Sequence, residues 1–410
     1  MHKRVLFLLV FSVAVLFIDR GSLSIAAPVL SSELALSPTQ LGMLLSSFFW
    51  TYASFGILSG WLVDRYNVNW VLGLAYFVWS AATFGTGFAS SLHSLVFLRL
   101  MLGVGESASY PAYSRIIERD FPADRRGLPN ALIDAGGKIG PAMGILVGGS
   151  LVAHYGWRTL FLVLGSGSLV WLIPWSLWAP HDVERKIAST AISVAEGPGV
   201  LDILRKRDAW GTFLGNFCCN YAYYFLMTWL PTYLVTERHL SMEMMGVVGS
   251  IPFWGSAASS VLAGWMSDRW IARGATATRV RKTFVVTGLA MASLILPVGL
   301  VPNLAVSIGL LIIVYLAFGL FSSNHWAITQ TLAGPKASGK WTGLQNAFAN
   351  LGGIIAPFLT GLIVSKTGSY FLAFLSSSAI VLIGAACYLF VVGKVQQVCW
   401  TTHLEAVECS

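Results

Sequence analysis

The sequence predicts an all-α membrane protein with twelve transmembrane helices in two pseudo-symmetric six-helix bundles. Only 11% of its 410 residues are charged, against about 25% in a typical soluble domain, and 56% are hydrophobic. Twelve apolar stretches reach the length of about 20 residues that a helix needs to cross a bilayer. The second half of the chain also repeats motifs of the first. The net charge of +8 does not indicate nucleic-acid binding, because most basic residues lie in short loops, where they bias membrane topology.

The predicted spans follow one another with short connections, except in the middle of the chain. In order they are residues 5–30, 40–62, 70–90, 92–116, 130–153, 158–178, 210–235, 244–266, 282–301, 304–330, 342–364 and 370–393. Residues 180–208 form the longest polar stretch and contain five basic residues. We therefore predict a first bundle over 1–179, a cytoplasmic linker over 180–208, a second bundle over 209–393 and a cytoplasmic tail over 394–410.

The basic residues predict the orientation. With the N-terminus placed inside, 20 of the 26 Lys and Arg residues lie on the cytoplasmic side. Three lie outside, namely Arg158, Arg238 and Lys366, and the other three lie within spans. Short cytoplasmic loops carry the excess of Lys and Arg in membrane proteins. Both termini are therefore expected in the cytoplasm.

The two halves resemble each other. Phe49-Trp50 and the run Gly60-Trp61-Leu62-Val63-Asp64-Arg65 recur at a constant offset as Phe253-Trp254 and Gly264-Trp265-Met266-Ser267-Asp268-Arg269. Internal repeats of this kind build two bundles around a central binding site in many transporters.

Charges inside spans give the sharpest functional signal, since each costs about 2.5 to 3.5 kcal/mol at a helix centre on insertion scales. Six residues qualify, and their formal charges cancel: Asp19, Arg20, Arg99, Glu106, Asp134 and Lys138. Asp19 and Arg20 are followed by Gly21, Ser22, Ser24 and Pro28, a composition suited to a broken helix that lines a cavity. The alternative is that Asp19 and Arg20 end a short helix at the membrane interface. The apolar sequence beyond them favours the buried interpretation.

Arg99 and Glu106 lie two helical turns apart on one face of the fourth span. About 10 Å separates them along the axis, which is too far for a direct pair, and Asp19 is the available acid for Arg99. Burial favours the protonated form of a carboxyl group, whereas a nearby guanidinium favours the charged form. Protonation can then change which acid an arginine holds, as a proton-coupled carrier requires. The alternative is a static ion pair.

Each of the remaining intramembrane charges and polar faces allows both a structural and a substrate-binding interpretation. Asp134 and Lys138 have the spacing of an intrahelical ion pair, although a Lys138 that points into the cavity would favour an anionic substrate. Polar residues recur at helical spacing on three later spans and should face inward: Asn216, Asn220 and Tyr224; Ser323, Trp326 and Gln330; Asn346 and Asn350. Interhelical hydrogen bonding is the alternative for each. Tyr52 and Trp326 are candidate walls of a binding cavity.

No enzyme signature competes with transport. The seven histidines lack a zinc spacing, and neither a Walker motif nor a dinucleotide-binding loop occurs. The run Gly103-Val104-Gly105-Glu106 is typical of helix packing. We expect no enzymatic activity, no cofactor and no metal.

Together these residues resemble the major facilitator superfamily, and within it the anion:cation symporters related to bacterial hexuronate, galactonate and glucarate carriers and to vesicular glutamate transporters. The general marks are the two Gly-Trp-x-x-Asp-Arg loops. The more specific marks are Asp19-Arg20 with Ser24, Ala26 and Pro28, the run from Arg99 to Glu106, the segment from Asn220-Tyr221 to Leu234, and Gly343 with Asn346, Asn350 and Gly352-Gly353.

The resemblance implies the major facilitator fold and a set of roles. Asp19 and Glu106 would be the proton-coupling acids, Arg99 would pair with either acid, and Arg20 would meet the substrate carboxylate. Tyr52, Ser323, Trp326 and Asn346 match positions that line the substrate cavity. Asp64 and Arg65, with Asp268 and Arg269 in the repeat, resemble the gating loops. Two departures are Asn67 and Asn69, where the family has Gly and a basic residue, and Lys138, which is not a general feature of the sugar-acid carriers.

The predicted function is therefore proton-coupled symport of a small organic anion by alternating access. The predicted site comprises Asp19, Glu106 and Arg99 for coupling, with Arg20, Tyr52, Lys138, Asn220, Tyr224, Ser323, Trp326 and Asn346 for substrate. We expect a monomer in the plasma membrane, the bacterial inner membrane, whose partners are the substrate, protons and lipid. An organic-anion exchanger or exporter remains open because sequence does not define the direction of flux. A transporter-like receptor remains a non-transport alternative, although it could dispense with intramembrane charges.

Overall fold

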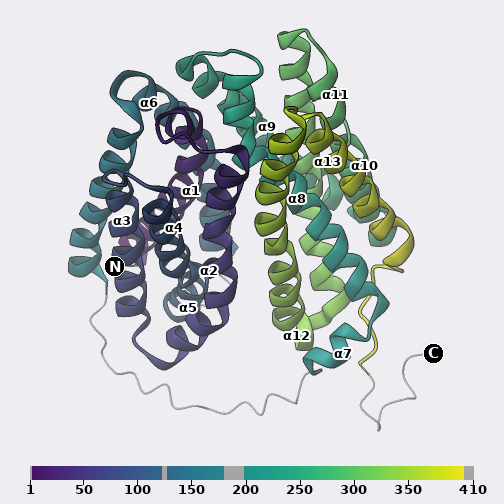
Figure 1. The fold of residues 1–410 in the computed structure, drawn as a ribbon. Coiled ribbons are helices and arrows are strands. Elements are labelled where there is room, and N and C mark those ends of the chain that lie inside the picture. Colours follow the sequence, from purple (N-terminus) through teal and green to yellow (C-terminus); the bar gives the residue numbers. More distant parts are fainter. Residues whose placement is uncertain (1, 122–126, 180–197, 401–410) are drawn as a thin grey trace. The chain divides into compact units, whose positions relative to one another are not determined.

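The computed structural model describes residues 2–121, 127–179 and 198–400, and these residues form helices joined by short connections (Figure 1). The first part of the chain contains α1 (His2–Glu33), α2 (Pro38–Arg65), α3 (Val68–Thr86), α4 (Leu92–Ser107), α5 (Ser109–Asp120) and α6 (Gly127–Trp178). The later part contains α7 (Val200–Leu204), α8 (Arg207–Thr236), α9 (Met242–Ala272), α10 (Ala277–Ala292), α11 (Ile295–Leu300), α12 (Leu304–Thr367) and α13 (Phe371–Ala386), and ends with a π-helical turn at Cys387–Val391.

Two helices are each too long for one crossing. α6 has 52 residues and α12 has 64, whereas about 20 suffice to cross a bilayer. Each contains one glycine with a positive φ, Gly156 at 81° and Gly334 at 64°, at which the helical conformation is interrupted. Glycine adopts this conformation without the steric cost that a Cβ atom adds. Each helix therefore consists of two crossing arms that meet at its glycine.

The twelve predicted spans are confirmed. By length and composition alone, seven of the described helices can cross a membrane, or eight when the bent pair 38–56 and 58–65 counts as one span. The two arms of α6 and of α12 raise this number to ten. The less apolar α8 and the pair α4 and α5 occupy the other two predicted places. The chain is thus an all-α, multi-pass membrane protein.

The predicted break in the first helix is wrong, since α1 continues through Asp19, Arg20 and Gly21 to Glu33. Ser22 Oγ donates to the main-chain oxygen of Asp19 at 2.7 Å, and Ser24 Oγ donates to that of Gly21 at 2.9 Å. These hydroxyls are satisfied by the preceding turn, so the polar composition does not open the helix. The burial that the sequence predicted for this part of the span is confirmed, because Asp19 is 0% exposed.

Other differences concern the ends of spans. The fourth predicted span is divided at Ala108 into α4 and α5, and the ninth is divided into α10 and α11. The short helix α7 lies in the stretch predicted to be a linker, of which residues 180–197 are outside the described residues. The same holds for residues 401–410 of the predicted tail.

Glycines allow the first arm of α6 to lie directly on α1. A Cβ atom on Gly136 would lie 2.6 Å from Val13 Cγ1, and one on Gly140 would lie 2.6 Å from the oxygen of Ala14. Gly144 and Gly148 continue this stripe at the same four-residue spacing, against Ile18 and Ile25. Small residues at this spacing are the usual device for close helix packing in membranes. They hold α1 in the orientation that places Asp19 and Arg20.

Contacts group the described residues into two units. The first comprises the described residues up to 179 with residues 224–257 and 353–373, and the second comprises residues 198–223, 258–352 and 374–400. The predicted division into bundles at residues 180–208 remains a prediction.

Candidate functional site

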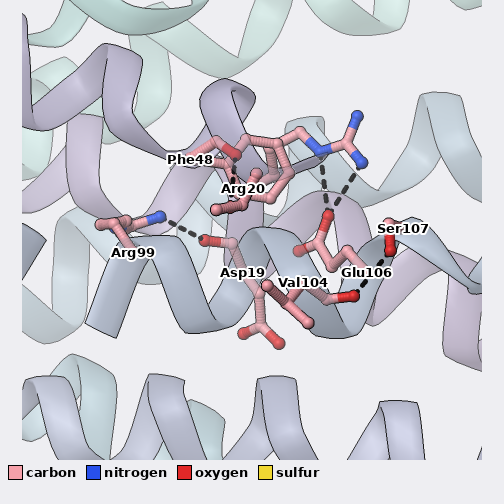
Figure 2. A network of polar contacts seen from close by, with 8 residues as sticks. Asp19, Arg20, Phe48, Arg99, Val104, Glu106 and Ser107 are labelled. Carbon is pink, nitrogen blue, oxygen red and sulfur yellow. Dashed lines mark hydrogen bonds and ion pairs between the residues drawn. The ribbon is translucent and has the colours of Figure 1, made fainter. Parts of the chain in front are cut away.

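The centre of the first unit is an ion pair between Arg20 on α1 and Glu106 on α4. Arg20 Nη2 and Nε both donate to Glu106 Oε2, at 2.8 and 3.1 Å (Figure 2). The side chains are 6% and 0% exposed. The second carboxylate oxygen, Oε1, is buried and makes no hydrogen bond within the described residues. Half of the carboxylate therefore keeps unused capacity for a proton or a donor.

Aromatic rings surround the Arg20 guanidinium. Its carbon lies 5.0 Å from the ring centre of Phe17, 4.9 Å from that of Phe48 and 4.6 Å from that of Tyr52. Such rings attract a cation electrostatically and are more effective where water is excluded. They hold Arg20 in place while leaving its N–H donors for an acceptor. Tyr52 was predicted as a cavity wall, and it lies against the arginine.

Glycines set the position of Glu106. A Cβ atom on Gly103 would meet the Phe48 oxygen of α2 at 2.4 Å, and one on Gly105 would meet the Ala75 oxygen of α3 at 2.8 Å. α4 therefore packs backbone to backbone against α2 on one side and α3 on the other. The prediction that Gly103 to Glu106 is a helix-packing motif is confirmed.

Arg99 binds no acidic side chain among the described residues. Its Nη1 donates to the main-chain oxygen of Asp19 at 3.4 Å (Figure 2). Its Nη2 donates to Ser22 Oγ at 3.3 Å. The sequence predicted the carboxylate of Asp19 as its partner, and that expectation is wrong. Because Asp19 and Arg20 are adjacent on α1, their side chains leave the helix in different directions. The predicted absence of a direct bond between Arg99 and Glu106 agrees with the structure.

The Asp19 carboxyl group lies apart from both arginine side chains (Figure 2). It is fully buried, and neither oxygen has a hydrogen-bond partner within the described residues. Thr83 of α3 lies beside it. The two predicted coupling acids therefore face different surroundings.

A small pocket opens beside Arg20. It is lined by Arg20, Leu23, Ser24, Leu45, Phe48, Phe49, Arg99, Met227 and Thr228. Met227 and Thr228 come from α8, and Tyr224 one turn earlier contacts Phe49 at 4.6 Å between ring centres. Tyr224 was predicted for the site from its polar spacing. Phe48, Phe49, Met227 and Thr228 were not, since apolar residues and a single threonine in a span give no signal by themselves.

Asp134 and Lys138 form the predicted intrahelical pair in α6. Lys138 Nζ donates to Asp134 Oδ2 at 2.8 Å, and the Asp134 side chain is 68% exposed. The charge of Lys138 is thus compensated by its own helix, which favours the structural interpretation.

The other predicted substrate residues belong to the second unit and bond within their own helices. Asn220 Nδ2 donates to Asn216 Oδ1 at 2.9 Å, and Asn350 Nδ2 donates to the main-chain oxygen of Asn346 at 2.9 Å. Ser323 Oγ accepts from Asn324 Nδ2 at 3.2 Å. The ring of Trp326 lies 4.5 Å from that of His325, a buried histidine that the sequence did not single out.

The repeated loops are alike in three dimensions. The Arg65 guanidinium lies 5.6 Å from the Trp61 ring centre, and that of Arg269 lies 5.3 Å from the Trp265 ring centre. Asp64 and Asp268 are exposed. Asn67, one of the departures from the family pattern, caps α3, because its Oδ1 accepts from the main-chain nitrogens of Asn69 and Trp70.

No group of three or more potential metal-ligating side chains occurs among the described residues.

Comparisons with known proteins agree with the architecture. The model of the Major Facilitator Superfamily matches residues 9–339 and 212–398. The chain is 31% identical over 430 residues to the "Probable galactarate/D-glucarate transporter GarP" of Escherichia coli (strain K12), with 97% of this chain and 96% of that one covered. It is 30% identical over 369 residues to the "Hexuronate transporter" of Bacillus subtilis (strain 168), covering 88% and 87%.

A solved structure of a bacterial homologue of the human lysosomal transporter Spinster, in an inward-facing and occupied conformation, has a TM-score of 0.81. It covers 95% of this chain and 96% of its own, and at 19% identity it bears on the fold alone. With its twelve crossing segments and a family match over most of its length, the chain is a transporter, not an enzyme, and belongs to the major facilitator superfamily.

Proposed function

We propose that this transporter carries a small organic anion, a sugar acid or a related carboxylate, into the cell together with protons. The observation that carries the proposal is the buried pair in which Arg20 gives two N–H donors to one oxygen of Glu106. A guanidinium presents the fork of donors that a carboxylate accepts. In the resting site Glu106 takes the place that a substrate carboxylate would take.

Protonation of Glu106 would release Arg20 to the substrate. Both side chains are almost completely buried, so a charge left without a partner is costly, and a proton or a substrate anion must replace what is removed. The unpartnered Oε1 of Glu106 is available to accept that proton. Proton and anion then enter together, because each lowers the cost of accommodating the other.

The surroundings suit a substrate with hydroxyl groups and a carboxylate. Ser24 and Thr228 supply hydroxyls in the pocket, Arg20 and Arg99 supply positive charge, and Phe48 and Phe49 supply apolar walls. The names of two relatives, given above, refer to galactarate, D-glucarate and hexuronate. Galactarate, D-glucarate and glucuronate are therefore the first candidates. A further relative, the "Probable sulfoacetate transporter SauU" of Cupriavidus necator, is 29% identical over 388 residues, so sulfoacetate belongs in the same screen.

The proposed direction of transport is into the cell. With the predicted orientation, both termini and residues 180–208 lie in the cytoplasm, and an inward proton gradient would drive uptake. An exchanger would instead move labelled substrate equally well with and without a pH gradient.

The test uses the purified full chain in sealed vesicles. Wild-type protein should accumulate a labelled sugar acid when the outside is acidic. Glu106→Gln should lose this accumulation but retain exchange of labelled for unlabelled substrate, because the neutral amide mimics the protonated acid. Glu118→Gln is the matched control, since Glu118 is an exposed acid on α5 that pairs with Arg115. Full gradient-driven accumulation by Glu106→Gln would overturn the proposed coupling, and exchange without any accumulation by the wild type would favour the exchanger.

A further inference from the structure

Asp19 is a buried acid that neither arginine of the site holds through its carboxylate. Its side chain is fully buried, and the carboxyl group points away from Arg99 and from the pair of Arg20 and Glu106 (Figure 2). The titratable or charged groups nearest to it are Glu106, Arg99 and Tyr76. None of them bonds to its carboxylate, since Arg99 contacts only the main-chain oxygen of Asp19. A carboxyl group in such surroundings must be protonated or hydrated.

A row of hydroxyl groups begins beside this carboxyl group. Thr83 is its neighbour on α3, and Ser80 and Tyr76 follow on the same face of the helix, at intervals of three and four residues. All three side chains are buried. Within the described residues, neither the Thr83 nor the Ser80 hydroxyl donates to the preceding turn of the helix. Ser168 of α6 lies beside the Tyr76 hydroxyl.

These unmade bonds are unusual within this chain. Most hydroxyl groups in its helices donate to the preceding turn, as Thr86 does to the main-chain oxygen of Ala82 at 2.8 Å and Ser47 does to that of Leu44 at 2.8 Å. Buried polar groups in proteins are nearly always paired, with protein or with ordered water. Two consecutive exceptions on one helix face, ending at a buried carboxyl group, therefore indicate bound water along the row.

The geometry points to a proton path: Asp19 exchanges its proton through water and the hydroxyls of Thr83, Ser80 and Tyr76, along a route separate from the pocket at Arg20. This inference rests on the proposed proton coupling and adds the residues that serve the second acid. The proton leaves the Asp19 carboxyl group, and each hydroxyl or water accepts one proton as it passes another on. No group is oxidised or reduced, and the carboxylate remains behind.

The direction of the path follows from the topology. Thr83 and Tyr76 are seven residues apart, about 10 Å along α3, and Tyr76 lies nearer the N-terminal end of the helix. The predicted orientation places that end on the cytoplasmic side. The path therefore leads from the middle of the membrane towards the cytoplasm, where a symporter must release its proton.

The test compares hydroxyl deletions on α3 in sealed vesicles. The double variant Ser80→Ala with Thr83→Val keeps the shapes of the side chains nearly unchanged and removes two relay groups. We expect uptake driven by a proton gradient to slow by about tenfold or more, with exchange of labelled substrate close to wild type. Tyr76→Phe should act in the same direction. Thr86→Val is the matched control, since Thr86 is buried on the same helix but its hydroxyl is already bonded.

The outcomes separate this inference from the function that it builds on. Retained exchange shows that a variant is folded, and the single variant Ser80→Ala replaces the double one if exchange is lost. If Asp19→Asn abolishes accumulation while the double variant accumulates at the wild-type rate, the path is wrong and the proposed coupling stands. If Asp19→Asn itself accumulates substrate fully, Asp19 is not a coupling acid and the path fails, whereas the coupling proposed for Glu106 stands on its own test. A rate lowered equally in Thr86→Val also overturns the path, because the effect then reflects packing.

Discussion

The guanidinium of Arg99 contacts the main-chain oxygen of Asp19 and leaves the carboxylate of that residue free of any bond to it. An arginine buried to 4% exposure in a membrane helix is thus held by a carbonyl and by the Ser22 hydroxyl. Its charge is not matched by a direct ion pair. We therefore expect Arg99 to accept an anionic partner when one becomes available.

Replacement of Arg99 by Lys should impair transport although the charge is kept. One ammonium group on a narrower stem does not reproduce the two donors that reach Asp19 and Ser22 on α1. We expect gradient-driven uptake to fall by about tenfold to a hundredfold, as small displacements in a charged site do elsewhere. Arg115→Lys, at an exposed pair on α5, is the control. Wild-type uptake by Arg99→Lys would show that only the charge matters.

Close packing between α3 and α6 should depend on a single glycine. A Cβ atom on Gly165 would lie 2.4 Å from both Cα and N of Phe84, and backbone atoms do not move aside cheaply. Gly165→Ala should lower the free energy of unfolding by about 1 to 3 kcal/mol. Gly167→Ala should be neutral or slightly stabilising, because nothing lies within 4 Å and alanine favours helix. Thermal unfolding in detergent measures both, and equal shifts would contradict the packing argument.

Exchange of the charges of Asp134 and Lys138 should leave transport intact. The pair is intrahelical, and Asp134 is mostly exposed. The double variant Asp134→Lys with Lys138→Asp keeps an ion pair worth about 0.2 to 0.5 kcal/mol. Substrate affinity in a thermal-shift titration should match that of the wild type. A loss of affinity in the double variant would show that Lys138 contacts the substrate.

The cap of α3 should be sensitive to the side chain of Asn67. Its Oδ1 accepts from the nitrogen of Asn69 at 2.8 Å and from that of Trp70 at 3.4 Å. Asn67→Ala should cost about 1 kcal/mol of stability, whereas Asn67→Asp, which keeps the acceptor, should cost little. Denaturation midpoints of the two variants provide the measurement. Equal destabilisation by both would mean that capping is not what Asn67 contributes.

Much of the fold was predictable because it follows from composition and period. Low charge and long apolar stretches determine that the chain spans a membrane, and the spacing of Arg99 and Glu106 shows that they share a helix face without touching. The repeat at a constant offset predicted similar loops, and the pairs of Trp61 with Arg65 and Trp265 with Arg269 confirm it. The turns at Gly156 and Gly334 match connections predicted between spans.

The partners of the charged residues were not predictable in the same way. The sequence by itself identified the six intramembrane charges and predicted that they compensate one another, since isolated charges are costly in lipid. The structure pairs four of them directly, Arg20 with Glu106 and Lys138 with Asp134. Only the tertiary structure decided that Arg20 binds Glu106, that Arg99 binds a main-chain oxygen, and that Asp19 lies beside Thr83 of α3. The physical reason is that neighbouring residues leave a helix about 100° apart, and spacing does not reveal which helix lies in each direction. That choice follows from backbone contacts at glycines such as Gly103, Gly105 and Gly140, whose importance depends on what packs against them.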